Sequence, residues 1–250
     1  CHHDELWHQY GHRCRGEPRY GCELCCRNAA HTPFHLPPQE LHSQGILPED
    51  EESISQNPLP YYFAMIESLD TELGRLISTL SSDTLELTLI VFIGDNGTPN
   101  QVAHSPYTSS KAQGSLYEGW IHVPLVVSGY GVSRRGEENA LVTAVDLYNT
   151  FLDAAGLALE ENLDSQSFWP LIREEVSNDR HFNYSEIIGD RPNKSGYTLT
   201  DGRYKFLSLD SGSAPLSTTA LMPMSVFSPI LHPCNIALCP TVTPFPISSG

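Results

Sequence analysis

The sequence predicts an α/β fold in which helices flank a sheet and a small antiparallel sheet follows near the C-terminal end. Residues 58–80 carry apolar side chains at three- and four-residue steps, the period of an amphipathic helix. Residues 87–93 form an unbroken apolar or β-branched run, typical of a strand buried on both faces of a parallel sheet. Residues 197–207 predict a hairpin that turns at Asp201 and Gly202. The helix and the apolar strand after it form half of a parallel crossover unit.

The composition limits the classes of function that the chain can have. Its 30 Asp and Glu residues outnumber its 14 Lys and Arg residues. This acidic balance argues against non-specific binding of nucleic acid, which needs a basic surface. It remains compatible with an anionic substrate if a metal and a few cations act locally. No apolar run approaches the length of a membrane span.

Residues 1–28 show neither a helical nor a strand period. They contain candidate metal ligands: His2, His3, His8, His12, Cys22 and Cys25. No second cysteine pair follows at the spacing of a zinc site, and no βαβ pattern surrounds the first pair. We therefore expect an atypical, poorly ordered N-terminal segment, with metal binding as the alternative.

A pair of oxygen donors follows the predicted buried strand. Asp95 and Asn96 lie at its carboxyl end, where open α/β sheets bind their ligands. Gly94 and Gly97 flank the pair and allow the backbone to turn sharply beside a ligand. Carboxylate and carboxamide oxygens suit Ca²⁺ or Mg²⁺ better than zinc. The alternative is an ordinary Asx turn that ends the strand.

The remaining pattern predicts one more strand and one more helix. Residues 123–127 form an apolar strand. Thr143 is expected to cap a helix that Gly156 stops. One face of this helix would carry Val145, Tyr148, Phe151, Leu152 and Ala155. Beyond Asp210 the chain is rich in Pro, Ser and Thr without any period, so we expect irregular structure there.

Three segments, in this order, resemble sulfatases of the alkaline-phosphatase superfamily. His31-Thr-Pro-Phe-His-Leu-Pro-Pro38 is similar to the family's His-x-Pro segment. Asp95-Asn-Gly97 is similar to its Asp-Asn-Gly motif, and residues 114–129, which begin Gly-Ser-Leu-Tyr-Glu-Gly, to the segment that follows this motif. The resemblance extends from about Ala29 to Leu207.

The resemblance implies a domain arrangement. The α/β sheet would be part of a sulfatase-like sheet flanked by helices. We expect an atypical segment over 1–28, the C-terminal part of a sulfatase-like core over 29–175, a small β subdomain over 176–210 and an irregular tail over 211–250.

The resemblance also implies roles for individual residues. Asp95 and Asn96 would help to hold Ca²⁺, and His31 would hold a sulfate oxygen. The family usually has a lysine just before the glycine of its Gly-Ser/Thr-x-Tyr-Glu-Gly segment, but here Gln113 stands at that position. Lys111, two residues earlier, would have to reach the same anion. Asn96, where the phosphatase branches have His, favours a sulfatase.

Other residues of the matched segments are expected to have structural roles. Glu118 would brace its loop, and Asp146 would support the fold. Trp120 and Ser165 stand where the family usually has glycine, and at Trp120 the backbone is expected to pack differently.

The implied function is Ca²⁺-dependent hydrolysis of a sulfuric ester, with a sulfated small molecule or glycan as substrate. Family members attack the sulfur with a formylglycine made from a Cys/Ser-x-Pro-x-Arg motif, and this sequence contains no such motif. We therefore expect the C-terminal portion of a sulfatase, with an incomplete calcium site and little activity alone. One alternative is a non-catalytic remnant or a binding protein for sulfated glycans. The other is a phosphonate or phosphate ester hydrolase of the same superfamily.

Overall fold

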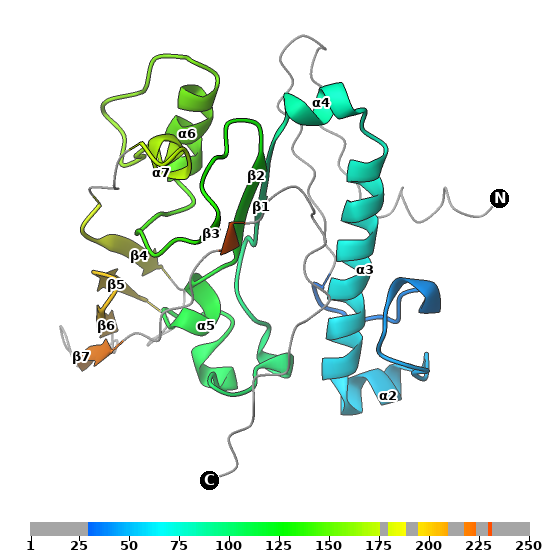
Figure 1. Ribbon diagram of the computed structural model, residues 1–250. Helices are drawn as coiled ribbons and strands as arrows, with labels where there is room; N and C mark the ends of the chain where they lie inside the picture. Colours follow the sequence, from blue (N-terminus) through cyan, green and yellow to red (C-terminus); the bar gives the residue numbers. More distant parts are fainter. Residues whose placement is uncertain (1–29, 176–179, 189–194, 210–217, 224–229, 232–250) are drawn as a thin grey trace. The chain divides into compact units, whose positions relative to one another are not determined.

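The computed structural model describes residues 30–175, 180–188 and 195–209, and the backbone of 218–223 and 230–231 (Figure 1). The chain divides into two compact units, residues 1–75 and 76–250. No helix among the described residues has the length and apolar character needed to cross a membrane. The Cys- and His-rich segment 1–28 lies outside the described residues, so its predicted disorder and its metal-binding alternative stay predictions.

The first unit is organised by the long helix α3 (Pro58–Ser78), whose last turn belongs to the second unit. The helix occupies the residues for which the apolar period predicted it. Two short helices precede it, η1 (Gln39–Leu41) and α2 (Glu51–Gln56). Asp50 caps α2 by accepting a hydrogen bond of 2.8 Å from the Ser53 N–H.

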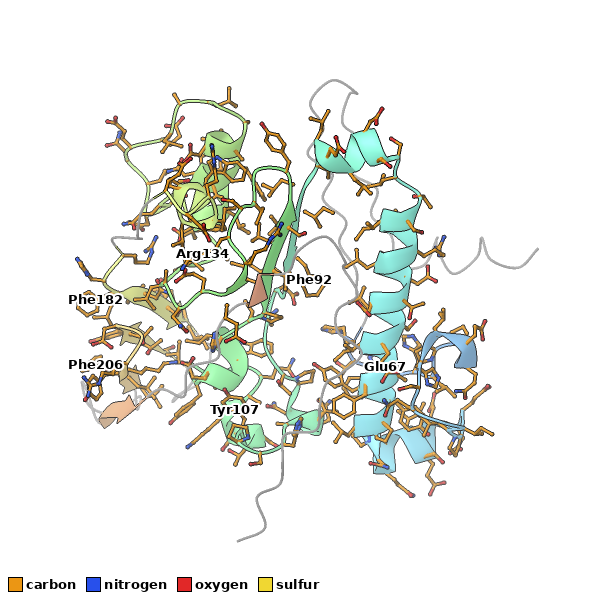
Figure 2. The ribbon with its side chains drawn as sticks, in the orientation of Figure 1. Glu67, Phe92, Tyr107, Arg134, Phe182 and Phe206 are labelled. Carbon is orange, nitrogen blue, oxygen red and sulfur yellow. The ribbon has the colours of Figure 1, made fainter. Side chains whose placement is uncertain are left out.

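The chain before α3 is fastened to that helix by polar contacts. Glu67, labelled in Figure 2, accepts hydrogen bonds from the Ser43 hydroxyl at 3.1 Å and from the Gln44 amide at 2.5 Å. The Tyr61 hydroxyl donates to the Pro48 carbonyl oxygen at 2.8 Å. On the surface of α3, Arg75 and Glu72 form an ion pair one helical turn apart.

After the last turn of α3, the second unit continues with α4 (Ser82–Glu86), capped by the Ser81 hydroxyl, and then β1 (Leu89–Ile93). The predicted strand thus exists but starts two residues later than expected. Leu87 lies at the end of α4 and is 76% exposed. The Leu87 and Thr88 N–H groups donate back to the Thr84 and Leu85 carbonyl oxygens, both at 3.1 Å, so the helical turn delays the start of the strand.

The partner of β1 differs from the prediction. β1 pairs with β2 (Leu125–Gly129) in antiparallel register, from Leu89 opposite Gly129 to Ile93 opposite Leu125 (Figure 1). All five β1 residues are half-buried. The expected parallel, doubly buried strand is therefore wrong for the described part of the chain. Residues 94–124 contain only short helices and lead the chain back alongside β1, whereas a parallel partner would need a crossover.

The hydrophobic core of the second unit lies against β2. It consists of Val127, Val132, Phe168, Trp169, Leu171 and Ile172. The short helix α7 (Trp169–Ile172) contributes three of these residues, and Leu89 and Val91 of β1 pack against the cluster. The Trp169 ring leaves no room for a side chain at Gly131, where a Cβ would lie 2.2 Å from a ring atom.

Helix α6 (Asp146–Ala154) is shorter at its start than predicted. Thr143 does not cap it. Instead the Asp146 carboxylate accepts a hydrogen bond of 2.7 Å from the Thr143 N–H. Gly156 ends the helix as expected, with φ of 69°. The predicted apolar face is largely exposed, at 56% for Val145 and 52% for Tyr148, because α6 buries its polar side instead.

The C-terminal part of the second unit forms the predicted small antiparallel sheet (Figure 1). Its strands, in spatial order, are β4 (Asn183–Ile187), β5 (Gly196–Thr200), β6 (Tyr204–Leu209) and β7 (Thr218–Pro223). β3 (Gly136–Glu137) and β8 (Ile230–Leu231) form a separate short pair. β7 and β8 lie within 211–250, where we expected irregular structure.

The predicted hairpin turn between β5 and β6 is confirmed. The Asp201 carboxylate accepts hydrogen bonds from the Tyr204 N–H at 2.6 Å and the Arg203 N–H at 2.8 Å. These two bonds lower the pKa of Asp201. Gly202 has φ of 85°, a conformation that favours glycine. The α/β class with a small C-terminal antiparallel sheet is thus confirmed.

Candidate functional site

The oxygen donors Asp95 and Asn96 lie just beyond the end of β1. Both residues are exposed. Within the described part of the chain, neither side chain makes a hydrogen bond or an ion pair. An Asx turn would use such a side chain to bond nearby backbone, and no bond of that kind is found there. Among the described residues, nothing occupies the oxygens of these two side chains.

The backbone around this pair is held firmly by the helix α5 (Glu118–Ile121). The Gly97 N–H donates to the Trp120 carbonyl oxygen and the Thr98 N–H to the Gly119 carbonyl oxygen, both at 2.8 Å. A Cβ at Gly97 would lie 2.3 Å from the Gly119 oxygen, so this approach requires glycine. These two bonds fix the loop directly after the donor pair, and we call residues 95–98 the donor loop.

Gln113 belongs to the same hydrogen-bonded frame. Its backbone N–H donates to the Thr98 carbonyl oxygen at 3.1 Å, and the residue is half-buried. The structure therefore attaches Gln113 directly to the donor loop. Trp120, which stands where glycine is usual, holds the loop through its backbone carbonyl oxygen.

Lys111 lies in the short helix η3 (Ser109–Lys111) and is exposed. Its Nζ is 5.3 Å from the centroid of the Tyr117 ring, a cation–π distance. The Lys111 carbonyl oxygen and the ring of Tyr107, labelled in Figure 2, both pack closely against Gly119. The backbone of Lys111 is thus close to α5, while its ammonium group rests on an aromatic face.

His31 lies in the first unit, in the extended segment before η1. It is exposed, and its Nδ1 lies 2.6 Å from the Thr32 carbonyl oxygen. This contact favours the tautomer that carries the proton on Nδ1 and leaves Nε2 for a ligand. That His31 shares an anion with Lys111 and Gln113 of the second unit stays a prediction.

The residues of the donor loop suit a hard cation but do not complete a site for one. Asp95 and Asn96 offer oxygen ligands, and Ca²⁺ takes about six to eight of these. Among the described residues, no three His, Cys, Asp or Glu side chains gather as metal ligands. Calcium binding by Asp95 and Asn96 stays a prediction.

Sequence reasoning missed one charged residue beside this frame, Lys205 of β6. Its Nζ pairs with the Glu118 carboxylate at the start of α5, and its side chain is only 3% exposed. Burial lowers the pKa of Lys205, and the Glu118 carboxylate opposes that shift. The strand period contained the signal, because Lys205 stands two residues before Leu207 and therefore on the same, buried face.

Asp146 has the structural role expected of it. It is 1% exposed and accepts hydrogen bonds from the Thr143 and Gln166 N–H groups at 2.7 and 2.8 Å. It also pairs with the Arg180 guanidinium. Ser165, at a position where glycine is usual, helps to fix the same helix, since its hydroxyl accepts from the Asn149 N–H at 3.1 Å.

Comparison with curated proteins finds relatives that are much longer than the match. Mouse arylsulfatase K is 30% identical over 167 residues, which cover 64% of this chain and 29% of that protein. Chicken arylsulfatase K is 32% identical over 160 residues, which cover 61% of this chain and 29% of the chicken protein. The match thus spans less than a third of either relative.

Solved structures share the fold over about half their length or less. A putative sulfatase from Bacteroides thetaiotaomicron has a TM-score of 0.53 and 19% identity, covering 87% of this chain and 48% of its own. A phosphonate monoester hydrolase from Silicibacter pomeroyi has a TM-score of 0.52 and 20% identity, and the match covers 78% of this chain and 45% of the hydrolase. A protein solved with its substrate D-glucosamine-2-N,6-O-disulfate has a TM-score of 0.50 and 20% identity, and the match covers 66% of this chain and 33% of that protein.

Two family models match the sequence itself. The model of the N-sulphoglucosamine sulphohydrolase C-terminal region matches residues 113–212. The sulfatase model matches residues 25–157, more than half of the chain, including His31, the donor loop and α5. This chain belongs to the sulfatase family.

Proposed function

We propose that this chain supplies the calcium- and sulfate-binding part of an enzyme that hydrolyses sulfuric esters. The observation that carries the proposal is the donor loop: two exposed oxygen donors without partners in the described chain, on a backbone fastened to α5. Exposed acceptors on a fixed backbone are suited to bind a cation, because little conformational freedom is lost on binding. The sulfatase match over residues 25–157 supports the assignment.

The chemistry of ester cleavage assigns a role to each residue around the loop. Negative charge develops on the sulfate and on the departing oxygen, and fixed positive groups and hydrogen-bond donors stabilise it. Calcium held partly by Asp95 and Asn96 would polarise the sulfate oxygens. Gln113 would donate a neutral hydrogen bond, His31 a second one, and Lys111 the charge that Gln113 lacks. Lys111 would have to leave the Tyr117 ring to do so.

The substrate is proposed to be a sulfated small molecule or glycan. A protein of the same fold was solved with a disulfated glucosamine as its substrate, which makes sulfated amino sugars the first compounds to try. The nucleophile would come from residues outside these 250, because the sequence contains no Cys/Ser-x-Pro-x-Arg motif.

Titration of the purified chain with Ca²⁺ tests the donor loop. We expect weak binding, with a Kd of about 1 mM or higher, since two protein ligands leave most of the coordination shell to water. Asp95→Ala should abolish it. Asp83→Ala is the matched control, because it removes one exposed carboxylate of the same unit from α4 and should leave binding unchanged.

Two results would contradict the proposal. Equal Ca²⁺ binding by the parent chain and Asp95→Ala would remove the cation from the donor loop. Turnover of an aryl sulfate by the isolated chain would show that the nucleophile is within it. An assay with matched aryl sulfate and phenylphosphonate esters would, in that event, also decide between a sulfatase and a phosphonate hydrolase.

A further inference from the structure

The ion pair between Lys205 and Glu118 joins two distant parts of the second unit. Lys205 lies in β6 of the small C-terminal sheet, and Glu118 opens α5, 87 residues earlier in the chain. The side chain of Lys205 is 3% exposed and that of Glu118 15% exposed. The pair is therefore shielded from solvent, so removing one partner would leave the other charge buried and uncompensated.

Glu118 is held on both of its carboxylate oxygens. Oε1 faces Lys205 Nζ, and Oε2 lies 3.4 Å from His122 Nδ1, an ion pair when the imidazole is protonated. The His122 N–H also donates to the Glu118 carbonyl oxygen at 3.2 Å. Lys205 of the C-terminal sheet thus orients the Glu118 carboxylate, and Glu118 is the first residue of α5.

Helix α5 has only four residues, so its own hydrogen bonds hold it weakly. Even so, its Gly119 and Trp120 carbonyl oxygens carry the two bonds that fix the donor loop. The Thr98 carbonyl oxygen in turn accepts from the Gln113 N–H. A continuous chain of contacts therefore leads from Lys205 through Glu118 and α5 to the donor loop and Gln113.

We propose that Lys205 is a positioning residue: through Glu118 it holds α5 in the place from which α5 fixes the donor loop and Gln113. In this arrangement the small C-terminal sheet supports the position of the oxygen donors Asp95 and Asn96. A role in stability alone accounts less well for this pair, because apolar side chains of similar size can replace a buried ion pair without loss of stability. The importance of this support for catalysis rests on the proposed function, but the support itself does not.

Amide hydrogen exchange, followed residue by residue by NMR on the whole chain, tests the proposal. Lys205→Met and Glu118→Gln should each speed exchange at the Gly97, Thr98 and Gln113 amides at least about tenfold, because α5 becomes free to shift. Amides that pair β1 with β2 should keep their rates. Arg203→Met is the matched control, since it removes an exposed cation next to β6 that rests on the Tyr204 ring.

Restoring the charge should restore the protection. Lys205→Arg, or the exchanged pair E118K/K205E, should return the three amides to within about threefold of their original rates. Unchanged rates at Gly97 and Thr98 in Lys205→Met would overturn the proposal. So would an equal increase at these amides and at those of β1, which would mean general destabilisation. The exchange rates need neither Ca²⁺ nor substrate, so a failed Ca²⁺ titration with the expected exchange pattern would refute the proposed function alone.

Discussion

Asp95 and Asp146 both lie in segments that match the sulfatase family, yet the fold treats them in opposite ways. Asp146 is 1% exposed and accepts hydrogen bonds from two backbone N–H groups while it pairs with Arg180. Asp95 is exposed and has no such partner within the described chain. The Asp146 carboxylate is thus engaged in bonds within the fold. The Asp95 carboxylate makes no such bonds among the described residues, while its backbone is fixed, an arrangement that suits a ligand-binding residue.

The two lysines near α5 repeat this contrast. Lys205 is buried and paired with Glu118, whereas Lys111 is exposed and only rests on the Tyr117 ring. Moving Lys111 would break one weak contact, while moving Lys205 would leave a buried charge unpaired. Lys205 is therefore suited to hold structure, and Lys111 to move toward an anion.

The largest difference between the two aspartates should be in stability. Asp146→Ala removes the carboxylate that pairs with the Arg180 guanidinium and accepts from the Thr143 and Gln166 N–H groups, so we expect the free energy of unfolding to fall by about 3–5 kcal/mol. Asp95→Ala removes nothing that the described fold uses and should change it by no more than about 0.5 kcal/mol. Urea unfolding of both variants measures the difference. Similar losses of unfolding free energy for the two variants would contradict the distinction between a structural and a ligand-binding carboxylate.

A smaller effect should follow from crowding the donor loop. Gly97→Ala places a methyl group 2.3 Å from the Gly119 oxygen and 2.7 Å from the Trp120 Cα, and both are backbone atoms that cannot yield easily. We expect a loss of about 1–3 kcal/mol, by the cost of overpacking, together with loss of Ca²⁺ binding. Gly94→Ala is the control, because its nearest neighbour is Pro124 Cδ at 3.1 Å. An unfolding curve for Gly97→Ala identical to that of the parent chain would mean that the contact with α5 is unimportant.

The parts of the fold that local sequence determines were predictable. The apolar period of α3 and the Asp201–Gly202 turn each depend on neighbouring residues, and both were found where expected. The donor pair was placed at the end of β1 for the same reason, since a buried strand followed by Asp and Asn is a local pattern.

The features that depend on distant partners were not predictable. The direction of β2 against β1 follows from how residues 94–124 return, and the apolar run of β1 is the same for either direction. The predicted N-cap at Thr143 is wrong because the helix begins only at Asp146, whose carboxylate is held by Gln166 and Arg180 from far along the chain. The strand period shows that Lys205 is on the buried face of β6, but its partner Glu118 lies 87 residues away and no sequence spacing connects the two.

The central claim is that the donor loop binds a hard cation through Asp95, and paramagnetic broadening tests it directly. Mn²⁺ also prefers carboxylate and carbonyl oxygens and broadens NMR signals of nearby nuclei. We expect added Mn²⁺ to broaden the Gly97 and Thr98 amide signals of the parent chain, and Asp95→Ala to prevent this broadening. Equal broadening of these two amide signals in the parent chain and in Asp95→Ala would contradict the claim.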